Sequence, residues 1–236
     1  MKLSIKGDII GNDDKWLYDW LDLEACCPRD VTRAIDDCAD GEELEVEISS
    51  GGGSVIAGSE IYTALQGYKK GALSIRVTGL AASAASVIAM AGHCEMSRTA
   101  LMMIHNASTV ARGDHQEMEH AAEVLRAADE AIAAAYVHKT GKSAEELADM
   151  MDRETWITAE KAVEMGFADG IIGEEGEPDL RVAAAGTNTL SAGTLRKIRS
   201  MIEKINAENK NADNGTDAIA RAEADYNFML LKGAQR

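Results

Sequence analysis

Short apolar segments alternate with amphipathic segments along residues 3–173, and this alternation restricts the fold more than any other property of the sequence. Residues 44–48 and 72–78 alternate apolar with polar side chains, as half-buried β-strands do. Residues 57–66 and 114–139 instead carry apolar side chains three and four positions apart, as amphipathic helices do. Strands that alternate with helices predict that this region is one mixed α/β domain.

Local signals place the remaining elements. Asp30 is expected to cap one helix, and Asp114 with Glu117 forms a capping-box pattern at the start of the longest helix. Thr158 is expected to cap a short helix that Gly166 ends. The other expected strands are 3–10, 94–96, 100–104 and 168–172. The other expected helices are 16–20, 86–91 and 143–151.

Charge and cysteine content exclude several classes of function. The chain has 236 residues and a formal net charge of −16, whereas nucleic acids and anionic membranes are bound by basic patches. Its four cysteines have neither CxxC nor zinc-site spacing, and no apolar run approaches the length of a transmembrane helix. We therefore expect a protein of the reducing cytoplasm that binds neither nucleic acid nor a membrane.

The sequence changes in character after residue 173. Residues 174–194 are rich in Glu, Ala, Gly, Thr and Ser, and we interpret them as a linker. Residues 195–236 contain two helical stretches separated by an Asn-rich segment, and over residues 174–236 the positive and negative charges nearly balance. We therefore predict a folded domain over residues 1–173, a linker over 174–194, and a helical tail over 195–236.

Ser83 lies in a run of small residues, Gly79–Ser86, between the predicted strand 72–78 and a short helix. At a helix N-terminus the dipole and the unpaired N–H groups favour negative charge, so a nucleophile is well placed there. The alternative is that alanine and serine only let two backbone segments pack closely, and the run taken alone favours this alternative. Ser86 is a second hydroxyl that could be the nucleophile.

Five histidines compete to be the base for Ser83. His105 follows the predicted strand 100–104, so the sheet would position its side chain at a strand-to-loop exit. Its alternative is an ordinary hydrogen-bonded loop histidine. His93 beside Cys94 is a weak metal pair without further ligands. The remaining three are interpreted as part of a solvated helix face: His115, His120 and His138.

The glycine run Gly51–Gly53 follows the predicted strand 44–48. Consecutive glycines allow positive φ and close approach of another segment. A serine nucleophile also needs backbone N–H groups that stabilise the oxyanion of acyl transfer. We expect the N–H of Ala84, next to Ser83, to be one donor and the N–H of Gly52 to be the second. The alternative is an ordinary flexible turn.

Four segments, in order, resemble the caseinolytic protease ClpP family. Residues 48–53 resemble its I-N-S-P-G-G run, and residues 79–83 resemble its G-x-A-A-S nucleophile motif. Residues 103–106 resemble its M-I-H-Q histidine motif, and residues 158–169 resemble its closing S-A-x-E-A-x-x-x-G-L-V-D segment. The resemblance covers roughly residues 3–173.

The sequence departs from the family pattern at two positions. Gly51 replaces the family's proline, which leaves the predicted oxyanion loop less rigid. Glu154 stands where the family has the aspartate of its catalytic triad, and Asp152 is the rival acid. The run Glu154–Trp156 resembles the E-T-W of the phage branch of the family, the prohead (capsid maturation) proteases. The segment after residue 173 is also similar in kind to theirs.

The resemblance implies an α/β fold of the ClpP/crotonase type, with repeated ββα units, a long protruding helix at 115–139 and the helical C-terminal tail. It implies a serine endopeptidase that needs no metal or organic cofactor. In this mechanism His105 deprotonates Ser83, Glu154 holds His105 in the correct tautomer, and the two N–H groups named above bind the oxyanion.

The resemblance also implies the partners. They are a polypeptide substrate, further copies of the chain in stacked rings, and in housekeeping relatives a separate ATPase. The phage branch would cleave scaffold or capsid protein inside the assembling prohead. We expect an extended substrate to pair with backbone at Gly53, Ser54, Asn106 and Ala107. The rival functions are a membrane-anchored serine–lysine peptidase, a crotonase-type acyl-CoA enzyme and a non-catalytic ring subunit.

Overall fold

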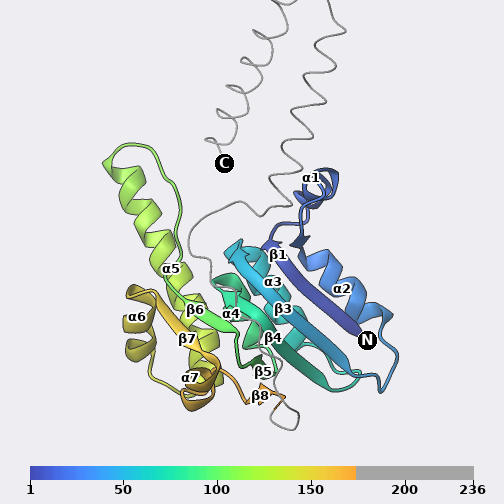
Figure 1. Cartoon of the computed structure of the whole chain (residues 1–236). Coiled ribbons are helices and arrows are strands. Elements are labelled where there is room, and N and C mark those ends of the chain that lie inside the picture. Colours follow the sequence, from blue (N-terminus) through green and yellow to red (C-terminus); the bar gives the residue numbers. More distant parts are fainter. Residues whose placement is uncertain (174–236) are drawn as a thin grey trace, which may run out of the picture. The chain divides into compact units, whose positions relative to one another are not determined.

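The computed structural model describes residues 1–173, in which the predicted α/β domain is confirmed (Figure 1). The predicted linker 174–194 and helical tail 195–236 lie outside the described residues. None of the helices in residues 1–173 combines the length and the apolar character needed to cross a bilayer. The elements are β1 (Lys2–Ile9), α1 (Lys15–Trp20), β2 (Ala25–Cys26), α2 (Pro28–Asp37), β3 (Leu44–Gly53), α3 (Val55–Gln66), β4 (Leu73–Ala82), α4 (Ala84–Ala89), β5 (His93–Ser97), β6 (Leu101–Ile104), α5 (His115–Thr140), α6 (Ala144–Asp152), β7 (Thr155–Thr158), α7 (Ala159–Glu164) and β8 (Gly170–Ile172).

The sheet of the described region has its strands in the order β2-β1-β3-β4-β5-β8, and all neighbours on this path are parallel. Strand β4 has two partners on one side. Its residues 74–77 pair with β5, and its residues 80–82 pair with β6. Strand β6 then pairs antiparallel with β7. We call this double pairing of β4 the fork. It places the carboxyl ends of the parallel strands β4 and β6 side by side.

The core lies between the sheet and the helices that follow its strands. Helix α3 contributes the fully buried Ile61 and Leu65, and every residue of α4 is buried. A Cβ at Gly58 of α3 would lie 2.9 Å from the Cβ of Ala84 in α4, so glycine is needed where these two helices touch. The close backbone packing considered as an alternative for residues 79–86 is therefore present.

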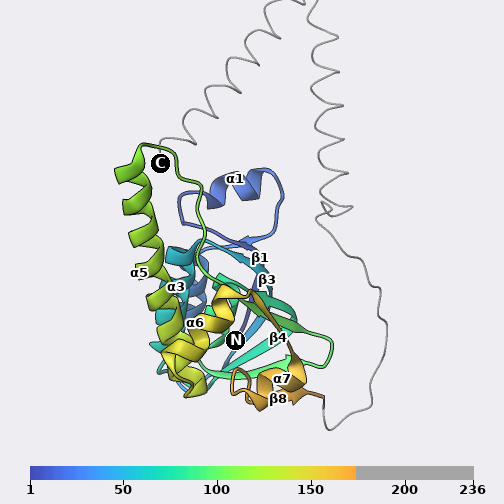
Figure 2. The same cartoon turned by 90° about the vertical axis from the view of Figure 1, so that its left-hand side faces the viewer.

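Helix α5 is the longest element, and α6 lies beside its C-terminal half (Figure 2). Its predicted capping box is confirmed, because Asp114 accepts hydrogen bonds from Gln116 and Glu117 and the Glu117 carboxylate accepts from the N–H of Asp114. Gly141 ends the helix in the left-handed conformation, at φ 70°.

Three sequence expectations differ from the structure. Asp30 was predicted to cap its helix, and this is wrong. Cys27 is the capping position before α2, and Asp30 is the third residue of the helix, where its carboxylate accepts a hydrogen bond from the Cys27 N–H. The strand predicted at 44–48 continues to Gly53, because β1 pairs with the glycine run as far as Ile9 opposite Gly53. Strands β2 and β7 were not predicted.

Ser83 forms the junction between β4 and α4, and its backbone is strained. Its φ is 55° and its ψ is −126°, a conformation that residues with a side chain rarely adopt. The N–H of Ser83 donates to the carbonyl of Met103 in β6, at 3.0 Å. The junction is thus held by its covalent link to β4 and by its hydrogen bond to β6.

We predict that Gly53→Ala destabilises the domain by about 3 kcal/mol. A Cβ there would lie 2.2 Å from the carbonyl oxygen of Ile9, and φ is 147°. Gly51→Ala is the matched control, because its Cβ would meet nothing within 4 Å, and we expect a change within about 0.5 kcal/mol. Urea unfolding measures both. Equal free energies of unfolding for the two variants would contradict the described register of β1 and β3.

We predict that Ser83→Gly is about 1 kcal/mol more stable than Ser83→Ala, because only alanine keeps a Cβ at φ 55°. Both variants lose the same hydroxyl, so the difference isolates the strain of the backbone. Thermal or urea unfolding of the two proteins gives the comparison. An alanine variant as stable as the glycine variant would show that Ser83 is not strained.

Candidate active site

Ser83 and His105 lie in hydrogen-bonding contact, with 2.8 Å between Ser83 Oγ and His105 Nε2. They come from the ends of the two strands that the fork aligns, since Ser83 follows β4 and His105 follows β6. When the serine hydroxyl donates to Nε2, the imidazole proton is on Nδ1. The geometry is that of a nucleophile with its base.

The other candidates for these two roles are placed elsewhere. Ser86 is fully buried and its hydroxyl donates to the carbonyl of Ser83 at 2.6 Å, so it faces the backbone instead of a cleft. His93 is exposed while Cys94 is fully buried, because neighbouring strand residues point to opposite faces of the sheet. His93 instead faces Asp169, with 3.5 Å between Nδ1 and the carboxylate.

Neither predicted acid contacts His105. The Glu154 carboxylate accepts from the indole N–H of Trp156 at 3.2 Å, and Asp152 accepts from the amide of Asn106 at 2.7 Å. Among residues 1–173, no carboxylate lies within 4.0 Å of a ring nitrogen of His105. The β6–β7 pairing ends with Ile104 opposite Thr155, the residues next to His105 and Glu154. The structure therefore brings Glu154 near His105 but shows no contact between their side chains.

The predicted oxyanion donors differ in availability. The N–H of Ala84 is the first of α4 and donates no hydrogen bond within the described residues. The N–H of Gly52 donates to Ser50 Oγ at 3.1 Å, because the Ser50 hydroxyl gives its own proton to the Gly7 carbonyl at 2.6 Å and keeps a lone pair for Gly52. The second donor is thus occupied in this structure.

Gly52 also packs directly against the nucleophile. A Cβ on Gly52, whose φ is 98°, would lie 2.7 Å from both the Cβ of Ser83 and the carbonyl oxygen of Ala82. Only glycine fits this approach. The expectation that the glycine run comes close to another segment is therefore confirmed, and that segment is the Ser83 turn.

The residues predicted to bind an extended substrate already have partners within the chain. Gly53 pairs with Ile9 in β1, and the N–H of Ser54 donates to the Ile9 carbonyl at 2.7 Å. Ser54 Oγ also caps α3. Asn106 is bonded to Asp152 as described above, and the N–H of Ala107 donates to Asp129 at 2.6 Å. The N–H groups of Ser54 and Ala107 are therefore already hydrogen-bonded within the chain and cannot also pair with a substrate strand.

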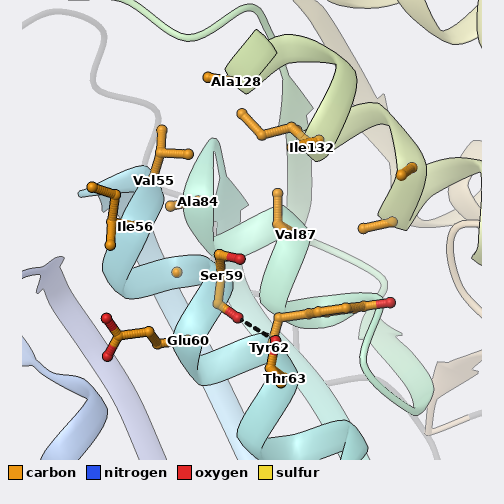
Figure 3. Close-up of a pocket in the computed structure, with 14 residues that line it drawn as sticks. Val55, Ile56, Ser59, Glu60, Tyr62, Thr63, Ala84, Val87, Ala128 and Ile132 are labelled. Carbon is orange, nitrogen blue, oxygen red and sulfur yellow. Dashed lines mark hydrogen bonds between the residues drawn. The ribbon is translucent and has the colours of Figure 1, made fainter. Parts of the chain in front are cut away.

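An apolar cavity of about 520 Å³ lies between α3, α4 and α5 (Figure 3). It reaches Ala84, the residue after Ser83, and Val87, Ala128 and Ile132 line the side formed by α4 and α5. Such a cavity fits an aliphatic side chain beside the nucleophile. The sequence offered no signal for it, because its walls come from three separate elements.

Two polar residues near the site were not singled out from the sequence. Tyr136 is buried in α5 and its hydroxyl lies 2.8 Å from Ser86 Oγ. Asp129 of α5 binds Ala107, as described above. The only signal for Tyr136 is a tyrosine within an alanine-rich helical stretch, and Asp129 is one of many acidic residues on the same helix.

Comparison with known proteins agrees with this fold. A family model described as Clp protease matches residues 33–175. An ATP-dependent Clp protease proteolytic subunit of Porphyromonas gingivalis is 36% identical over 143 residues, which cover 58% of this chain and 63% of that protein. The chain therefore aligns with a little under two thirds of that relative's length.

A solved structure of a ClpP1 mutant from Listeria monocytogenes shares the fold. Its TM-score with this chain is 0.59 at 22% sequence identity, and the match covers 74% of this chain and 92% of that one. At this identity the likeness concerns the fold alone. The family model, in contrast, spans more than half of the sequence. On that basis the chain belongs to the Clp protease family.

Proposed function

We propose that this chain is the proteolytic subunit of a serine endopeptidase. The observation that carries the proposal is the 2.8 Å contact between Ser83 Oγ and His105 Nε2 at the ends of two paired strands. Membership of the Clp protease family supports it. A crotonase-type enzyme would not need this pair, and a non-catalytic ring subunit would not need to keep it.

In the proposed mechanism His105 Nε2 takes the proton of Ser83 as its oxygen attacks a peptide carbonyl. The resulting oxyanion is held by the N–H of Ala84 and by the N–H of Gly52, once Gly52 leaves Ser50. His105 then gives the proton to the leaving amine, and the peptide bond breaks. Water, deprotonated by His105, hydrolyses the acyl-enzyme and regenerates Ser83. Glu154 would accept the Nδ1–H of His105 after its side chain rotates.

The substrate is proposed to be an extended polypeptide. The apolar cavity beside Ala84 would take the side chain that precedes the cleaved bond. Backbone pairing would use the edges of Gly53 and Asn106 that their partners in the chain leave open, and pairing at Ala107 requires its N–H to leave Asp129. Substrate specificity would then depend on one apolar side chain of the substrate, bound in the cavity, and on the extended conformation of the substrate backbone.

The assembly proposed for the chain is a homo-oligomeric ring that encloses the sites. A separate ATPase is the partner proposed by analogy with the Porphyromonas gingivalis relative, which is named as ATP-dependent. Capsid maturation is the second candidate role. It is favoured by the run Glu154–Trp156 and by the segment after residue 173, with scaffold or capsid protein as substrate. Portal and capsid genes beside the coding region would favour that role, and their absence would favour the ATPase partner.

We predict that Ser83→Ala and His105→Ala each abolish labelling by a fluorophosphonate probe, because the reagent needs a serine activated by its base. Gel fluorescence measures the labelling, and size-exclusion chromatography checks that assembly is unchanged. Ser4→Ala, at an exposed position of β1, is the control and should label like the wild type. Labelling of Ser83→Ala would assign the nucleophile to another residue and overturn the proposal.

We predict that Glu154→Gln lowers peptidase activity by about 10²–10⁴, as loss of a triad carboxylate does, while Asp152→Asn lowers it less than about threefold. Glu154 directly precedes Thr155, which pairs with the residue before His105, whereas Asp152 binds Asn106. Hydrolysis of a fluorogenic peptide gives both values. If the larger loss follows Asp152→Asn, Asp152 is the third member of the triad.

A further inference from the structure

Helix α5 makes hydrogen bonds to the segments that follow Ser83 and His105. Tyr136 reaches the Ser83 turn through Ser86, and Asp129 reaches the loop after His105. The two residues are seven positions apart, which is close to two helical turns, so they share one face of the helix. One rigid element therefore holds the two segments whose separation sets the serine–histidine distance.

The contact with the Ser83 turn is a directed chain of two hydrogen bonds. Ser86 has one hydroxyl proton, and it is donated to the Ser83 carbonyl at 2.6 Å. The Tyr136 hydroxyl, 2.8 Å from Ser86 Oγ, must then be the donor to Ser86. Burial raises the pKa of Tyr136, so the phenol keeps its proton. Both side chains are almost completely buried and have no competing water contact to lose.

The Ser83 turn needs such support because its backbone is strained. A residue with a side chain stays at φ 55° only when its surroundings hold it there. On one side the N–H of Ser83 is bonded to Met103. On the other side the carbonyl of Ser83 accepts from both the N–H and the hydroxyl of Ser86, and Tyr136 fixes that hydroxyl.

The contact with the histidine loop is a single charged hydrogen bond. The Asp129 carboxylate accepts the N–H of Ala107 at 2.6 Å, two residues after His105. A charged acceptor makes this bond stronger than one between neutral groups. It ties the start of the loop to α5 directly after the strand that carries the base.

We propose, on the basis of the function proposed above, that Tyr136 and Asp129 are positioning residues that hold Ser83 and His105 at hydrogen-bonding distance. Neither touches the reacting atoms. Tyr136 acts through Ser86 on the Ser83 carbonyl, and Asp129 acts through the Ala107 backbone on His105. Any shift of α5 along its axis would displace both anchors together.

The test uses the full-length chain with Tyr136→Phe and Asp129→Ala. Phenylalanine keeps the aromatic ring that packs edge-on against Phe167, at a centroid distance of 5.8 Å, and removes only the hydroxyl. We expect each variant to react with a fluorophosphonate about five- to tenfold more slowly, the effect of one hydrogen bond felt in the transition state. In crystal structures of the variants we expect the Ser83 Oγ to His105 Nε2 separation to exceed 3.5 Å.

Three further variants separate positioning from loss of stability. Asp129→Asn keeps an acceptor oxygen and should restore most of the labelling rate. Glu130→Ala removes a neighbouring exposed charge of the same helix and should label like the wild type. Ile61→Val trims the buried core of α3, so it lowers the unfolding midpoint without touching the network and should leave the labelling rate unchanged.

The outcomes distinguish this inference from the proposed function. A wild type that is not labelled refutes the proposed function, and the serine–histidine separations in the crystal structures then decide the inference alone. Unchanged separations in both variants overturn the positioning role, whatever the rates. Slow labelling that Ile61→Val reproduces at an equal loss of stability also overturns it.

Discussion

The double pairing of β4 is the constraint on which the rest of the site depends. Its first part lies beside β5 and its last part beside β6, so the chain after β4 and the chain after β6 leave the sheet at neighbouring points. Ser83 and His105 occupy those points. Because parallel strands end at the same edge, a nucleophile and a base that are far apart in sequence meet without a dedicated loop.

The strand-end residues could be predicted from the sequence, and the side-chain directions could not. Ser83 and Gly52 come after segments that alternate as strands do, and His105 comes after a short apolar run, so each could be placed at the end of a predicted strand. That the three meet is what the family resemblance implies. The bond of the Glu154 carboxylate to the indole N–H of Trp156, in contrast, depends on a side-chain rotamer, which the pattern of residue types does not specify. The bond of Gly52 to Ser50 likewise depends on the Gly7 carbonyl in another strand.

The two buried serine hydroxyls near the nucleophile both have hydrogen-bond partners, and this limits which changes the site can tolerate. Ser50 bridges Gly7 and Gly52, and Ser86 bridges Tyr136 and the Ser83 carbonyl. A buried hydroxyl that loses its partner costs about 1–3 kcal/mol. These serines therefore fix the backbone of two loops at once. If one of these loops changes conformation, the hydroxyl of its serine must find a new hydrogen-bond partner.

The contact of Gly58 with Ala84 has a consequence for how this lineage can vary. Helix α3 lines the apolar cavity with several of its residues, and under the proposed function substitutions there would change which substrate side chain the cavity accepts. At Gly58, however, the first added methyl group would press on the residue that follows the nucleophile. Helix α3 can therefore vary at its other cavity-lining residues, whereas a side chain at Gly58 would displace the residue next to the nucleophile.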